Sequence, residues 1–174
     1  MTHLYKAAAA AVASIALIAG ASAASAQSLG FNLAGQDVTA TGQLIQNVDY
    51  PGVIQTTCDV SIYGTVAADG SKIVFSSYDG AKAPGDGGNL ACSESLKFPI
   101  TVTASAANQI NMDDFDVGTR GGPCRELNYK LAYSGNTATF SGQPFGYQGL
   151  CNASGGLTLT ADSNGAAVNI VTLP

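Results

Sequence analysis

Residues 92–124 read CSESLKFPITVTASAANQINMDDFDVGTRGGPC, and this stretch decides the fold class. Apolar and polar residues alternate over residues 96–104, which predicts a half-buried β-strand because successive side chains of a strand point to opposite faces. Residues 105–108 then reverse the chain, and the apolar pattern resumes. A one-residue slip at residues 113–114 predicts a β-bulge that keeps Phe115 on the apolar face. The stretch therefore predicts an antiparallel hairpin.

The chain has four cysteines, which in an exported protein predict two disulfide bonds. Cys92 and Cys124 occupy mirror positions about the corner of the hairpin, so we expect them to bond to each other. Cys58 is then left to bond to Cys151. No cysteine belongs to a C-x-x-C pair and none lies near a histidine, so we expect no metal site.

Residues 1–26 have the pattern of a secretory signal peptide. Lys6 gives a positive start, residues 7–19 form an apolar run too short to span a membrane, and residues 24–26 read Ala-Ser-Ala, a small-residue cleavage site. The mature protein is then one domain, residues 27–174, with no later apolar run that could cross a bilayer. We expect it to be secreted, either to the periplasm or outside the cell.

The mature chain would be acidic and poor in reactive groups. Six basic residues stand against twelve acidic ones once Lys6 is removed, and no histidine or tryptophan remains. Nucleic acids bind clustered Lys and Arg, so this charge balance excludes a nucleic-acid partner.

The rest of the chain repeats the alternating pattern and predicts an all-β fold. Residues 31–50 are ragged and predict one or two weak strands at a sheet edge. Similar but clearer alternation occurs over residues 58–66, 73–75, 127–133, 138–140, 157–161 and 168–170. A membrane barrel of eight strands would fit the count, but the chain ends without an aromatic terminal strand and has no paired aromatic girdles. We therefore expect a single disulfide-bonded antiparallel β-sandwich of about eight to ten short strands.

Candidate functional groups are few. Without a mature histidine the commonest general base is missing. A pair of carboxylates could serve a glycosidase, and Asp113, Asp114 and Asp116 are clustered in the sequence. The strand pattern, however, places Asp113 on the opposite face from the other two. We expect no catalytic residues, no cofactor and no enzymatic activity.

Two aromatic residues, Phe145 and Tyr147, lie in a stretch rich in Gly, Gln and Pro that we interpret as a flexible loop. An aromatic side chain in such a loop has little local strand to pack on, so it either faces a ligand or partner or folds back over the end of the core. Phe145 and Tyr147 are the candidate interface residues.

Several segments of the chain resemble the exported activators of alkane oxidation of the PraB type. The resemblance rests on CDVSIYGTV at residues 58–66, LKFPITV at residues 96–102, GGPC at residues 121–124, and Cys151 leading into Gly-Leu-Thr at residues 156–158. It spans about residues 58–160. The family tends to have tryptophan after the proline that corresponds to Pro99, where this chain has isoleucine.

The resemblance implies a small secreted factor that acts during growth on hydrocarbons and has no assigned catalytic site. We expect a non-enzymatic protein that acts at hydrocarbon or cell-surface interfaces. The alternative is an extracellular structural, adhesive or matrix module that self-associates through an edge strand at residues 31–50. A secreted hydrolase is a third interpretation and would require a cleft with converging carboxylates.

The signal peptide gives the first testable prediction. Mature protein recovered from the periplasm or the culture supernatant is expected to begin at Gln27, because Ala24 and Ala26 satisfy the small-residue rule of signal peptidase. N-terminal sequencing checks the cleavage site. A secreted protein that retains Met1 would contradict this interpretation.

Overall fold

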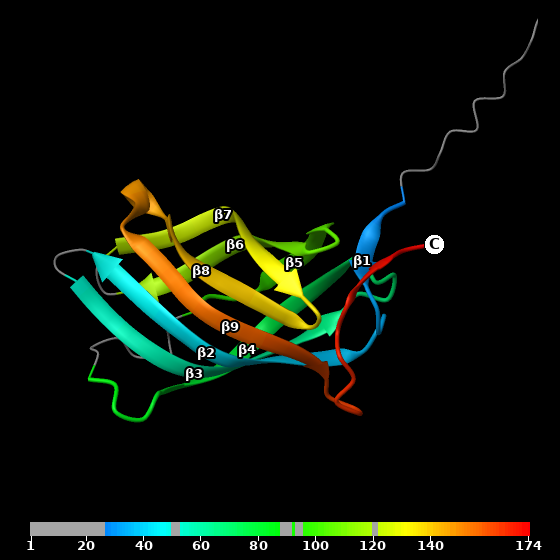
Figure 1. Ribbon diagram of the computed structural model, residues 1–174, viewed down its shortest axis with the longest axis horizontal. Coiled ribbons are helices and arrows are strands. Elements are labelled where there is room, and N and C mark those ends of the chain that lie inside the picture. The colour runs from blue at the N-terminus through cyan, green and yellow to red at the C-terminus, as the bar shows by residue number, and fades with distance from the viewer. Residues whose placement is uncertain (1–26, 50–52, 88–91, 93–95, 120–121) are drawn as a thin grey trace, which may run out of the picture.

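The computed structural model describes residues 27–49, 53–87, 92, 96–119 and 122–174 (Figure 1). The expected signal peptide, residues 1–26, lies outside them. The described elements are strands β1 (Leu29–Phe31), β2 (Asp37–Asp49), β3 (Val53–Val66), β4 (Lys72–Lys82), β5 (Ile100–Ala106), β6 (Gln109–Thr119), β7 (Gly122–Ser134), β8 (Thr137–Phe145), β9 (Cys151–Ala161) and β10 (Ile170–Thr172), and the 3-10 turn η2 (Tyr147–Gly149). Within the described ranges, no helix is long and apolar enough to cross a membrane.

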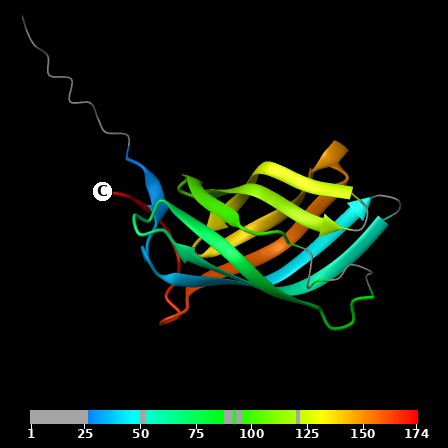
Figure 2. The ribbon, with the colours of Figure 1, turned by 180° about the vertical axis from the view of Figure 1, so that it is seen from behind.

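Strands β2 to β9 form a closed antiparallel barrel, so the expected β-sandwich is wrong. Each strand pairs with the next one in the chain, and the last, β9, pairs with β2 from Val38 opposite Ala161 to Val48 opposite Cys151. Figures 1 and 2 show the barrel from its two sides. A sandwich and a barrel have the same alternation along each strand. They differ in whether the first and last strands pair, which no local pattern reveals.

The expectation of a weak edge strand in residues 31–50 is also wrong, because β2 pairs along its length with both β3 and β9. The ragged pattern has a physical cause. A Cβ atom at Gly42 would lie 2.0 Å from the carbonyl oxygen of Gly156, and one at Gly155 would lie 2.1 Å from the carbonyl oxygen of Gln43. Glycine is needed here because the two backbones approach each other too closely for a side chain.

The interior of the barrel is apolar and its outside is polar. Side chains that alternate inward, such as Val60, Ile62, Leu131 and Leu159, are buried. Between them Asp59, Tyr63 and Thr158 are exposed. This arrangement accounts for the period-two pattern of the sequence, because one face of every strand meets the core and the other meets solvent.

The predicted hairpin is confirmed over β5 and β6, which turn at residues 107–108 and pair Val102 with Met112. The slip at residues 113–114 also keeps Phe115 inward, where it is 1% exposed. Asp114 has a left-handed φ of 58° at this point.

The expected disulfide pairing is wrong: Cys58 bonds to Cys92, and Cys124 bonds to Cys151. All four cysteines are buried and none is free. The reason is the position of β6. Leu96 pairs with Val117 on one side of β6, whereas Cys124 in β7 pairs with the same Val117 on the other side. Cys92 and Cys124 are therefore on segments that β6 separates.

Among the described residues, the barrel wall has two seams where neighbouring strands pair only at one end. Strand β4 pairs with β5 only from Lys72 to Phe75, although β4 continues to Lys82. Strand β7 pairs with β8 only over three residues at their shared turn, with Ala132 opposite Thr139 as the last pair. Each disulfide lies at the diverging end of one seam: Cys58 is paired with Lys82, and Cys151 with Phe145.

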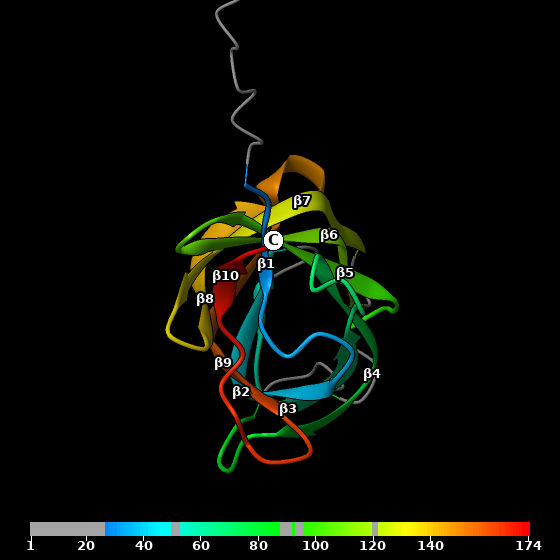
Figure 3. The same ribbon diagram turned by 90° about the vertical axis from the view of Figure 1, so that its right-hand side faces the viewer.

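The end at which both seams are closed is capped by the two-stranded sheet of β1 and β10 (Figure 3). Phe31 of β1 is buried, and its N–H donates to the carbonyl of Gly70 at 2.7 Å. The Tyr133 hydroxyl of β7 donates to the carbonyl of Val168 at 2.6 Å. The segments that precede and follow the barrel thus cover one of its two ends.

At the other end the core is aromatic. The rings of Phe115, Tyr129, Phe140 and Phe145 form a cluster with centroid separations of 5.0–6.0 Å. Phe145 is 4% exposed, since β8 continues to this residue and places its ring inside the barrel. The interpretation of this stretch as a flexible loop that begins before Phe145 is therefore wrong.

The seams predict a specific disulfide map. Peptide mapping without reduction is expected to give one fragment pair that joins Cys58 to Cys92 and another that joins Cys124 to Cys151. On the loop-entropy model, removing the first bridge with Cys58→Ser and Cys92→Ser lowers the free energy of unfolding by about 3.5–4 kcal/mol. The second bridge should still form in that variant. Recovery of a Cys92–Cys124 fragment would contradict the strand order described above.

Burial predicts that the two candidate aromatic residues differ in their effect on stability. Phe145→Ala is expected to lower the free energy of unfolding by about 3–5 kcal/mol, because it opens a cavity in the aromatic cluster. Tyr147→Ala is its control and should change that free energy by no more than about 0.5 kcal/mol. Urea unfolding followed by circular dichroism measures both. Equal effects of the two substitutions would rule out this assignment.

Candidate functional site

The seam between β7 and β8 opens into a groove, which we name the β7–β8 window. It is framed by the Ala132–Thr139 pair at one end and by the Cys124–Cys151 disulfide at the other. The groove has a volume of about 410 Å³. It is lined by Gln109, Glu126, Asn128, Tyr129, Lys130, Ala132, Ser141, Gln143, Pro144 and Phe145.

Side chains rather than a backbone ladder bridge the window. The Gln143 side-chain amide donates to the Lys130 carbonyl at 3.4 Å, which is a long contact. Below it lie Tyr129 and Phe145 of the aromatic cluster. The window is therefore lined mainly by polar groups, and the aromatic rings beneath them are buried.

Tyr129 is the chemically unusual group of the window. Its side chain is 1% exposed, and its hydroxyl has no hydrogen-bond partner among the described residues. Burial, with a smaller contribution from the negative charge of Glu126, raises the pKa of Tyr129 to about 12. The hydroxyl therefore keeps its proton at neutral pH and can donate a hydrogen bond.

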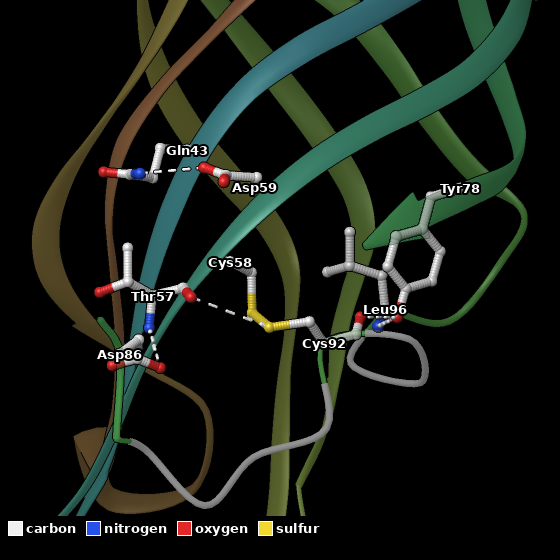
Figure 4. The surroundings of a disulfide bond; sticks show 8 residues. All are labelled: Gln43, Thr57, Cys58, Asp59, Tyr78, Asp86, Cys92 and Leu96. Atoms are coloured by element: carbon white, nitrogen blue, oxygen red, sulfur yellow. Dashed lines mark hydrogen bonds between the residues drawn. A yellow bond between two sulfur atoms is a disulfide. The ribbon is translucent and has the colours of Figure 1, made fainter. Parts of the chain in front are cut away.

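The second seam, between β4 and β5, is closed by a tyrosine whose hydroxyl is fully used (Figure 4). The Tyr78 hydroxyl donates to the carbonyl of Cys92 at 2.7 Å and accepts from the N–H of Leu96 at 3.2 Å. Its ring stacks on Phe98 with centroids 5.4 Å apart. The two seams thus contain the same parts, a disulfide and a tyrosine, but only the β7–β8 window leaves its tyrosine hydroxyl without a partner.

Two large apolar side chains are exposed near the β7–β8 window. Tyr147 of η2 is 63% exposed and Leu127 of β7 is 59% exposed. η2 packs against β7, near the end where that strand begins (Figure 1). Of the two candidate interface residues, the structure therefore places Tyr147 at the surface and Phe145 in the core.

The exposure of Leu127 was not predicted from the sequence. Period-two alternation places it on the inward face with Tyr129 and Leu131, but the pairs Asp113–Asn128 and Phe115–Glu126 show that β7 slips in step with the slip of β6. The slip turns Leu127 outward. The signal in the sequence was the slip at residues 113–114, which also constrains the paired strand.

The clustered aspartates are engaged in contacts within the protein. Asp114 forms an ion pair with Arg125, which holds the pKa of the Asp114 carboxyl below its usual range. Asp116 accepts from the Lys97 ammonium at 2.9 Å. Asp113 accepts from the Asn111 side-chain amide at 2.7 Å. Within the described residues, no group of three or more His, Cys, Asp and Glu side chains is placed to hold a metal ion.

Comparison with known proteins identifies the family of the chain. A family model described as the alkane oxidation protein activator, PraA/PraB-like, matches residues 1–167. No curated protein matches the chain, and no solved structure matches it either. The family match contains all eight strands of the barrel, both disulfides and the β7–β8 window. The chain therefore belongs to the PraA/PraB-like family of alkane oxidation protein activators.

Proposed function

We propose that this protein is a secreted, non-catalytic factor that promotes alkane oxidation by adsorbing to the surface between hydrocarbon and water. Membership of the activator family supports the link to alkane oxidation. The observation that carries the proposal is the exposure of Tyr147 and Leu127, the two most exposed large apolar side chains of the described residues, on the neighbouring elements η2 and β7.

The magnitude of this apolar exposure fits reversible adsorption. Fully burying a large apolar side chain contributes about 1.5–3 kcal/mol, so two side chains that are about 60% exposed contribute roughly 1–2 kcal/mol each. This is too little for deep insertion but enough to orient a molecule at an oily surface. Two disulfides and a closed barrel allow that contact without unfolding.

The rival interpretation as a matrix or adhesive module has less support. An open strand edge at residues 31–50 would have favoured it, but β2 is paired on both sides. The hydrolase interpretation required converging carboxylates. Asp114 and Asp116 are instead each paired with a cation.

Replacing the exposed pair tests the adsorption. The variant with Tyr147→Ser and Leu127→Ser is expected to lower interfacial tension between hexadecane and water less than the unaltered protein, because it loses roughly 2–4 kcal/mol of apolar contact. Its melting temperature should hardly change. The matched control is Tyr63→Ser, which removes a 36% exposed tyrosine from the outside of β3. Interfacial tension is followed by pendant-drop measurement, and equal curves for the double variant and the unaltered protein would refute the proposed contact.

The physiological role is tested by growth. A strain that lacks the protein is expected to grow more slowly on hexadecane but normally on succinate, and purified protein added to the medium should restore growth. The double variant should restore it less well, since adsorption is the proposed activity. A growth defect of the same size on both carbon sources would remove the link to alkane oxidation.

A further inference from the structure

The segment that leads into β1 connects the expected signal peptide directly to the cap of the barrel. Gln27 and Ser28 are exposed, whereas Gly30 and Phe31 are buried. The N–H of Leu173 donates to the carbonyl of Ser28 at 2.8 Å, so the cap holds the backbone from this carbonyl onward. Gln27 is therefore left in solvent, immediately before the folded part of the chain.

The backbone groups of this segment point alternately to its two sides. The carbonyl of Ser28 and the N–H of Asn32 bond to the segment that contains β10, whereas the N–H of Phe31 points the other way and donates to Gly70. Successive residues of an antiparallel strand alternate in this manner. The same alternation directs the backbone nitrogen of Gln27 away from β10. A chemical change at that nitrogen therefore removes no hydrogen bond of the two-stranded cap.

Cleavage after Ala26 gives Gln27 a free α-amino group beside its own side-chain amide. The α-nitrogen can attack the side-chain carbon Cδ, and the new C–N bond closes the lactam ring of pyroglutamate while the bond from Cδ to Nε2 breaks. The proton lost by the amine leaves with Nε2 as ammonia, so the step needs no oxidant, reductant or cofactor. An α-amino group loses its proton more readily than a lysine does, so the nucleophile is present at neutral pH.

We propose that the exported protein carries pyroglutamate at residue 27, and that this lactam protects the mature chain from aminopeptidases. The inference rests on the proposed function in one respect, the export of the chain with cleavage before Gln27. Aminopeptidases bind a free α-amino group, which the lactam lacks. Because the cap holds the backbone from Ser28 onward, no loose tail remains in front of the barrel for an exopeptidase to shorten.

The modification is tested by expressing the whole chain in a bacterium and recovering the exported protein from the periplasm or the medium. An endoprotease that cuts before aspartate releases residues 27–36, because Asp37 is the first aspartate after the cleavage site. We expect mass spectrometry to find this peptide lighter by one ammonia than its sequence requires, with fragment ions that place the loss at Gln27. Gln36, in the same peptide, is the internal control, since it has the same side chain but no free amine and should be intact.

Gln27→Asn is the matched variant, because it keeps a side-chain amide but is one methylene too short to close the unstrained lactam. Its first peptide should have the full mass. Incubation with an aminopeptidase should remove residue 27 from the variant but not from the unaltered protein. After treatment with pyroglutamyl aminopeptidase, N-terminal sequencing of the unaltered protein should begin at Ser28. Equal trimming of the two proteins by the aminopeptidase, or trimming of neither, would overturn the protective role of the lactam.

Failure of this inference is distinguishable from failure of the proposed function. An exported chain that begins at Gln27 with no loss of ammonia would refute the lactam and leave the export intact. A chain that begins at any other residue would also overturn the inference, and one that retains Met1 would contradict the export as well. Adsorption to hexadecane should be normal in Gln27→Asn, because η2, which contains Tyr147, lies at the end of the barrel opposite to the cap (Figure 1).

Discussion

The pairing of β9 with β2 is the constraint on which the rest of the structure depends. It closes the sheet, so that the inward side chains of the eight strands share one core. Closure also forces the two backbones together at Gly42 and Gly155, where no side chain fits. Because β2 is paired on both sides, it offers no edge on which another chain can add. The small residues of β2, which weaken the local strand pattern, are therefore a requirement of the global fold.

The backbone pairing around the barrel is incomplete at the two seams, and each seam contains one of the two disulfides. Where β4 leaves β5, Cys58–Cys92 and the hydrogen-bonded Tyr78 hold the wall together. Where β7 leaves β8, Cys124–Cys151 holds the far end and the aromatic cluster fills the gap. A covalent bond is effective there because the backbone ladder that would otherwise join the strands is missing.

Phe145 and Tyr147 are only two residues apart, but one is buried and the other is exposed. Phe145 ends β8 and completes the aromatic core, whereas Tyr147, two residues later, projects from η2 into solvent. The left-handed backbone at Gly146, with φ of 72°, lets the chain leave the barrel wall between them. A rigid core residue thus lies beside a surface residue that is free to contact an apolar phase. Adsorption through Tyr147 therefore need not disturb the barrel.

The sequence by itself determined the strand character of the chain, the β5–β6 hairpin, the inward position of Phe115 and the resemblance to the activator family, because alternation and turn residues are local properties. Only the tertiary structure decided the barrel, the disulfide partners and the exposure of Leu127. Closure depends on pairing between residues more than a hundred positions apart. The partner of Cys92 depends on which side of β6 each segment lies. Leu127 is exposed because a slip in one strand shifts its neighbour, a coupling that exists only once the two strands are paired.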